Sequence, residues 1–244
     1  MKHVGSFTRK MVPVGIALVA AALTISVQAQ TQQGKAIVMG IKGSADYSDG
    51  GGSWMPLAVN TVLRQGSTVR TADNSEVELN LAQNGPAVRV NKNSTLGLDK
   101  LLFEKTGADV VIETRLDLKA GRVQGSVKKT AASSIYQVKT PRAVAGIRGT
   151  EYDISADGMV IVKQGTINVD FLRGGQTLKF VVNEKQTFDP SIPGVRAATQ
   201  PELSWPAIVV TGGGPSSTIV FEPGKEPYVS PTNSKGTGTS NPNP

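Results

Sequence analysis

Two carboxylates, Glu151 and Asp153, come nearest to a catalytic arrangement in this sequence. They stand two positions apart in a predicted strand, so their side chains project from the same face. Glycoside hydrolysis uses a pair of carboxylates that flank the scissile bond. Because neighbours on one strand are poorly placed to flank a bond, we predict no catalytic residues and a protein that is not an enzyme.

A second acidic pair, Asp46 and Asp49, precedes three consecutive glycines. Calcium loops combine acidic ligands with glycine, but they need more ligands and a closing bidentate glutamate. We therefore interpret this stretch as a glycine-rich hairpin tip. The sequence predicts no metal site and no cofactor.

The chain has no cysteine, and His3 is its only histidine. Ser-His-Asp and Cys-His catalysis therefore have no candidates beyond residue 3, and neither do thiolate or imidazole metal sites. Disulfides cannot stabilise the fold.

The first 29 residues have the pattern of a signal peptide. Lys2, Arg9 and Lys10 form a basic start, an apolar stretch follows, and Val27 and Ala29 supply the small residues of a cleavage site. The alternative is an uncleaved anchor helix, but the apolar run is shorter than the roughly 20 residues that a span needs. We expect an exported protein, periplasmic or on the cell surface, without a transmembrane span after cleavage.

Cleavage would remove three cations and no anion, lowering the formal charge from +7 to +4. The remaining lysines and arginines are scattered and are not interleaved with aromatic residues, so we expect no nucleic-acid partner. Ten of the fourteen prolines lie at or beyond Pro190. This shift predicts a structured domain over residues 35–189 and a low-complexity, largely disordered tail over residues 190–244.

Within residues 35–189 the apolar residues alternate with polar ones, and turn residues recur every ten positions or so. Val77 and Leu79 alternate with charged residues before the turn at Asn84-Gly85, which is typical of half-buried strands. Asp157-Gly158 predicts a type I′ hairpin turn, and Gly174-Gly175 predicts another turn. The fold class is all-β: one domain of many short antiparallel strands, either a sandwich or a β-roll that coils like a solenoid. We expect Trp54 and Leu57 to cover one end of its core.

The segment over residues 140–153 stands out because small residues, two glycines and one arginine follow a proline. We single out six residues as motif or interaction candidates: Thr140, Pro141, Gly146, Arg148, Gly149 and Thr150. Gly146 and Gly149 are predicted to sit where a side chain would clash or where φ is positive. Arg148 has two interpretations: it receives a partner's carboxylate, or it pairs within the domain with Glu151, Asp153 or a turn carbonyl.

This segment resembles the centre of the FecR domain, a periplasmic sensor-regulator module. Other blocks resemble the family in the same order along the chain, and the resemblance covers roughly Leu57 to Gln186. They are residues 54–57, 63–71, 75–79, 118–123 and 162–167. The resemblance identifies the chain as a stand-alone exported FecR-like protein.

The resemblance implies a non-catalytic protein that binds a protein or a cell-envelope component. It also implies a connection with signal transduction or the regulation of uptake, such as signalling linked to sigma factors. The alternative is a structural or scaffold protein of the envelope or surface.

Overall fold

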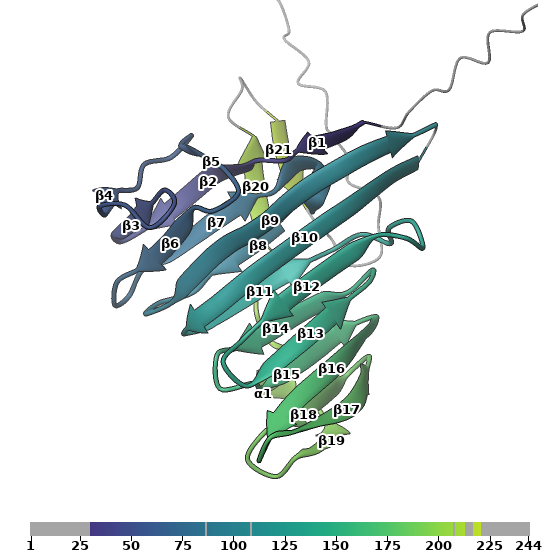
Figure 1. Ribbon diagram of the computed structural model, residues 1–244. Helices are drawn as coiled ribbons and strands as arrows, with labels where there is room; N and C mark the ends of the chain where they lie inside the picture. Colours follow the sequence, from purple (N-terminus) through teal and green to yellow (C-terminus); the bar gives the residue numbers. More distant parts are fainter. Residues whose placement is uncertain (1–29, 86, 108, 207, 213–216, 221–244) are drawn as a thin grey trace, which may run out of the picture.

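The computed structural model describes residues 30–85, 87–107, 109–206, 208–212 and 217–220. Its strands form two large sheets that lie face to face (Figure 1). The predicted signal peptide, residues 1–29, lies outside the described residues, as does most of the tail beyond residue 212. The all-β prediction is confirmed.

Sheet A has ten strands and sheet B has nine. Sheet A consists of β1 (Thr31–Gln33), β3 (Ala45–Ser48), β4 (Met55–Pro56), β6 (Thr68–Thr71), β9 (Thr95–Thr106), β10 (Asp109–Ala120), β12 (Ile135–Lys139), β13 (Ala143–Ile147), β16 (Thr166–Arg173) and β17 (Gln176–Asn183). Sheet B consists of β2 (Ala36–Lys42), β5 (Val62–Leu63), β7 (Glu76–Asn80), β8 (Ala87–Val90), β11 (Arg122–Ser126), β14 (Glu151–Ser155), β15 (Val160–Gln164), β18 (Gln186–Asp189) and β19 (Gly194–Ala197).

Beyond the first five strands, β1 to β5, the order of the strands follows the sequence in both sheets. From β6 onward sheet A continues with β9, β10, β12, β13, β16 and β17, while sheet B takes up the strands between them. The chain therefore crosses from one layer to the other again and again as it advances, which is why the colours in Figure 1 run from purple at one end to green at the other. Neighbouring strands are antiparallel except β10 and β12, which are parallel. The two architectures left open by the sequence are combined, because this sandwich progresses like a solenoid.

The core lies between the sheets and takes the inward-facing residue of each alternating pair. Val77, Leu79, Ile154 and Val169 are fully buried in one continuous apolar cluster. The period of two in the sequence therefore marks the inner face of each strand, as expected for half-buried strands.

Two tyrosines form a polar contact across this core. Tyr136 of β12 and Tyr152 of β14 lie in opposite sheets with their hydroxyl oxygens 3.2 Å apart. Burial raises the pKa of both phenols, so both are neutral at physiological pH. A Cβ at Gly125 would come within 2.3 Å of the Tyr152 ring, so this glycine makes room for the buried ring.

The turns confirm one prediction and correct another. Gly174 and Gly175 both have positive φ and join β16 to β17 in a two-residue hairpin. At the β14–β15 hairpin only Gly158 has a positive φ, whereas a type I′ turn needs two such residues. The Gly158 N–H donates to the Ser155 carbonyl, and Ile154 pairs with Val160, so the loop is longer than predicted.

One end of the sandwich exposes apolar side chains. Leu57 is buried as expected, but Trp54 is 41% exposed. The guanidinium of Arg70 lies 4.1 Å from the centre of the Trp54 ring, and Arg70 also pairs with Asp46. Trp54 is therefore not a core residue, because its ring lies against the exposed guanidinium of Arg70.

Candidate interaction surface

The segment over residues 140–153 consists of a turn, strand β13, a crossing between the sheets and strand β14. Thr140 closes the turn: its buried hydroxyl oxygen accepts hydrogen bonds from the backbone N–H groups of Arg142 and Ala143 at 3.2 and 2.9 Å. Pro141 is exposed within this turn. Thr140 and Pro141 therefore lie at one end of β13, on the opposite side from the crossing.

The crossing from sheet A to sheet B is made at Gly149 and Thr150. Gly149 has a φ of +64°, a conformation that side chains rarely adopt. Thr150 is buried, and its hydroxyl donates to the carbonyl of Thr166 at 3.0 Å. A Cβ at Gly165 would lie 2.5 Å from the Gly149 carbonyl oxygen, so the two chain segments touch. These residues form a structural junction between the layers.

Gly146 and Arg148 face outward on sheet A instead. A Cβ at Gly146 would meet nothing closer than the Asn168 carbonyl oxygen at 3.8 Å, and its φ is not positive. The predicted clash at Gly146 is therefore wrong, because the residue points away from the core.

Arg148 is exposed, and its side chain makes no hydrogen bond or ion pair within the part of the chain that the structure describes. Glu151 pairs with Lys163, and Asp153 pairs with Arg122. Neither of the two carboxylates proposed as partners therefore forms an ion pair with Arg148.

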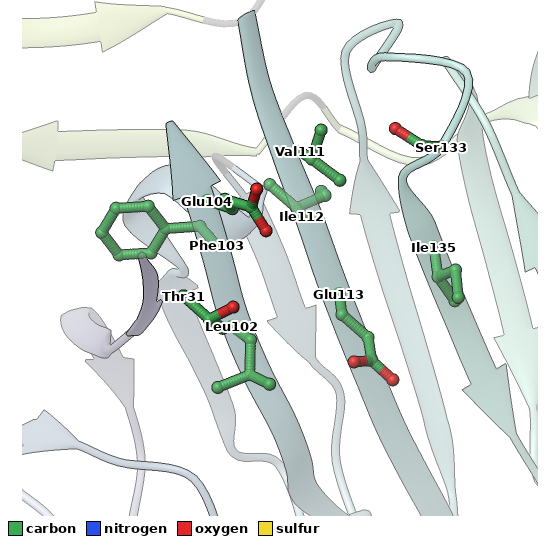
Figure 2. Close-up of a pocket in the computed structure, with 9 residues that line it drawn as sticks. All are labelled: Thr31, Leu102, Phe103, Glu104, Val111, Ile112, Glu113, Ser133 and Ile135. Atoms are coloured by element: carbon green, nitrogen blue, oxygen red, sulfur yellow. The ribbon is translucent and has the colours of Figure 1, made fainter. Parts of the chain in front are cut away.

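Two adjoining hollows open on the outer face of sheet A around these residues. The first, of about 420 Å³, is lined by Gly146 of β13, by Arg148 just beyond the end of β13 and by Asn168 of β16. Residues 134–137, which begin just before β12, also line it. The second, of about 180 Å³, lies over β9 and β10. Figure 2 shows Leu102, Val111 and Ile135 along this second hollow, with the carboxylate of Glu113 beside them. Ile135 lines both hollows and is 38% exposed.

Strand β10 has an unpaired stretch beside the second hollow. Its pairing with β12 begins at Glu113 opposite Ile135, although β10 itself begins at Asp109. The N–H of Ile112 donates to the Ser134 hydroxyl at 3.1 Å. Residues 109–111 therefore face no strand on that side within the described chain, and such an edge can accept an added strand.

The outer face of sheet B carries a row of polar residues in direct register. The row runs through Glu78, Arg89, Gln124 and Asp153 on β7, β8, β11 and β14. Arg89 bonds Glu78 at 2.8 Å, and Gln124 donates to Asp153 at 2.7 Å. Asp153 is 1% exposed, and burial raises the pKa of its carboxyl although the bonds from Arg122 and Gln124 act in the opposite sense.

A C-terminal segment, residues 199–206, covers this row, and we call it the strap. It begins with the short helix α1 (Gln200–Leu203), where Glu202 forms a two-pronged ion pair with Arg196 at 2.6 and 2.8 Å. Farther on, the Pro206 carbonyl accepts from Arg89 at 3.1 Å. Lys163 lies 5.2 Å from the centre of the Trp205 ring. This part of the outer face of sheet B is therefore covered by its own chain.

Beyond the strap, Ile208 is buried against Ala87 and Met39. The strands β20 (Val209–Gly212) and β21 (Ser217–Val220) then pair with each other as a small separate sheet.

Sequence reasoning did not identify the strap or the hollows. The strap does have a local signal, because Thr199 and Glu202 have the spacing of a helix capping box and Pro201 follows the cap. The hollows have a weaker signal: Val111 and Ile135 are apolar residues at outward-facing positions of their strands. Which positions face outward depends on the register of strand pairing, and the sequence alone does not determine that register.

Among the described residues, no group of three or more His, Cys, Asp or Glu side chains is placed to hold a metal ion. In the same residues, no helix has the length and apolar character needed to cross a membrane.

Residues 67–175 match the family model described as FecR protein. The resemblance inferred from the sequence is thereby confirmed, and this part of the chain is a FecR domain. The match supports a role related to signalling in general, within a family that is regulatory.

Two crystal structures of "a putative anti-sigma factor from Parabacteroides distasonis ATCC 8503" are similar to the chain at 11% identity, with TM-scores of 0.40 and 0.39. Each similarity covers 54% of this chain and 59% of the other, so the chain spans about three fifths of those proteins. No curated protein matches the chain.

Proposed function

We propose that this chain is an exported, non-catalytic FecR-domain protein that binds a protein partner in a signalling process. The partner docks on the outer face of sheet A, over the two hollows that share Ile135. The FecR match supports the signalling role. The signal-peptide pattern of residues 1–29 supports export to the periplasm or the cell surface.

The choice of surface rests on one observation: the outer faces of the two sheets differ in what covers them. The strap covers the polar row on the outer face of sheet B, and its contacts include the Arg196–Glu202 and Arg89–Pro206 bonds. The outer face of sheet A has no such strap in the described chain and carries the two hollows. An exposed arginine beside an apolar depression is a common composition for the centre of an interface.

The physical character of this surface favours a protein partner. Exposed Ile135 offers apolar area, the unpaired stretch of β10 offers backbone groups, and Arg148 offers an unused guanidinium. A partner that presents an extended strand with a carboxylate would use all three features. Arg148 then acts as a recognition residue, whereas Gly149 and Thr150 hold it in place.

Photo-crosslinking from defined positions tests the proposal. A photoreactive residue at Asn168, on the exposed face of sheet A, is compared with one at Ile192, which is 81% exposed in the β18–β19 turn. Each protein is incubated with the envelope fraction of its own organism and irradiated. We expect a specific protein adduct from position 168 and none from position 192.

The variant Arg148→Ala supplies the second measurement. We expect it to weaken capture at least about tenfold, because a hydrogen bond to a charged group contributes about 1.5 kcal/mol or more. Equal adducts from both positions, or an adduct that Arg148→Ala leaves unchanged, would contradict the proposed surface.

A scaffold role is the second candidate, and the end of the sandwich favours it. Trp54, Met55, Val59 and Val62 are each more than 40% exposed at this end. Apolar side chains at an open end of a stacked fold suit end-to-end assembly. Sedimentation distinguishes the two roles: a scaffold forms oligomers that Met55→Lys and Val62→Lys disperse, whereas a partner-binding domain stays monomeric and keeps its adduct in those variants.

A further inference from the structure

A polar pocket lies between the strap and sheet B, on the opposite side of the molecule from the hollows of sheet A. It has a volume of about 410 Å³, within the range of about 300–1,000 Å³ that small-molecule sites occupy. Its floor comes from β11 and β14, and one wall comes from the strap, including Trp205. The pocket thus combines an aromatic wall with a polar floor.

One hydrogen-bond donor of this pocket is buried without a partner. The side-chain nitrogen of Asn91 makes no hydrogen bond to the described protein. The Asn91 backbone is held firmly, because its N–H donates to the Arg122 carbonyl at 3.0 Å. An unsatisfied buried amide is costly and calls for an explanation. A ligand oxygen in the pocket would satisfy it.

Two carboxylates of the pocket are already paired, and Glu76 and Lys92, which have opposite charges, also line it. Asp153 is paired with Arg122 and Gln124, and Glu202 is paired with Arg196. An ionic ligand of either sign would have to disrupt these pairs, because it would meet a like charge among them. A neutral ligand with hydroxyl groups can use the remaining lone pairs and N–H groups without displacing them.

We propose that the pocket between the strap and sheet B binds a neutral, hydroxyl-rich ligand, namely a mono- or disaccharide unit of a glycan. The Trp205 ring packs against the flat apolar face of the sugar ring. Asn91 donates to a ring hydroxyl, and the amide of Gln124 and the lone pairs of Asp153 orient the others. The proposal goes beyond the proposed function and does not depend on the hollows of sheet A.

Trp205 supplies a direct reporter for the test. The chain has two tryptophans, and the other, Trp54, lies at the exposed end of the sandwich. In a Trp54→Phe background, the fluorescence of Trp205 is followed while maltose, N,N′-diacetylchitobiose, sodium phosphate or dilysine is added. We expect a saturable change with at least one of the two disaccharides and none with phosphate or dilysine.

The variants Asn91→Ala and Gln124→Ala then test the assigned roles. Each variant should weaken the affinity for the disaccharide about tenfold, which is the upper range for the loss of a neutral hydrogen bond. Asn91→Ala should not lower the thermal unfolding midpoint, since the side-chain amide has no partner to lose and the cost of burying it is removed. The matched control Asn183→Ala, on exposed β17, should keep full affinity.

Three outcomes overturn the proposal: no response to either disaccharide, a response to phosphate or dilysine alone, or unchanged affinity in Asn91→Ala. These results leave crosslinking from position 168 unaffected, so failure of this site and failure of the proposed function are distinguishable.

Discussion

Two glycines of the same motif should respond differently to the same substitution. Gly149 has a φ of +64°, and a Cβ added there would lie 3.2 Å from the Cα of Lys129. A side chain in this left-handed conformation costs about 1–2 kcal/mol, and crowding in a packed region adds about 1–3 kcal/mol. For Gly149→Val we therefore expect a loss of about 3 kcal/mol. That loss lowers the melting temperature of a domain of this size by about 6–12 °C.

Gly146→Val is the matched control for this prediction. The added side chain would meet only an ordinary contact of 3.8 Å, and valine favours a strand. Its stability should stay within about 0.5 kcal/mol of the wild type. Thermal unfolding of both variants is followed by far-ultraviolet circular dichroism. A wild-type melting temperature for Gly149→Val, or equal losses in both variants, would refute the assignment of Gly149 to the crossing and Gly146 to the open face.

Three further predictions concern the strap, the core and export. The Arg196 guanidinium holds the pKa of Glu202 at about 2, below its ordinary 4.5, so strap docking should be complete above pH 4.5 and weaken as pH falls toward 2. Trp205 fluorescence should report this transition, and Glu202→Gln should abolish it. Tyr152→Phe should cost about 1–3 kcal/mol in urea unfolding, because it leaves the buried hydroxyl of Tyr136 unpaired; an unchanged midpoint would show that this bond contributes nothing. N-terminal sequencing of exported protein should begin at Gln30, and retention of Met1 would contradict signal cleavage.

The segment over residues 140–153 contains two kinds of position: residues that shape the backbone and residues on the exposed face of sheet A. Thr140, Gly149 and Thr150 shape the ends of β13, and the hydroxyls of Thr140 and Thr150 bond to backbone atoms. Gly146 and Arg148 lie between these ends on the exposed face. A short sequence can therefore carry fold-defining and surface positions alternately, because successive residues of a strand point to opposite sides.

The sequence by itself determined the strands and the family. The alternation of Val77 and Leu79 with charged neighbours is local, so it predicted a half-buried strand without knowledge of its partners. The Gly174-Gly175 turn was predictable for the same reason, since its backbone conformation depends on those two residues. The ordered blocks around residues 140–153 led to the FecR domain for the related reason that each block is a local pattern of residues.

Only the tertiary structure decided which sheet each strand joined and what covered each face. Residues far apart in the sequence, such as Arg89 and Pro206, meet because the strap returns across sheet B. Gly146 and Gly149 are chemically identical, and only their positions in β13 and at the crossing show that one is open to solvent and the other constrained. Register and layer assignment depend on long-range pairing, so local patterns cannot supply them.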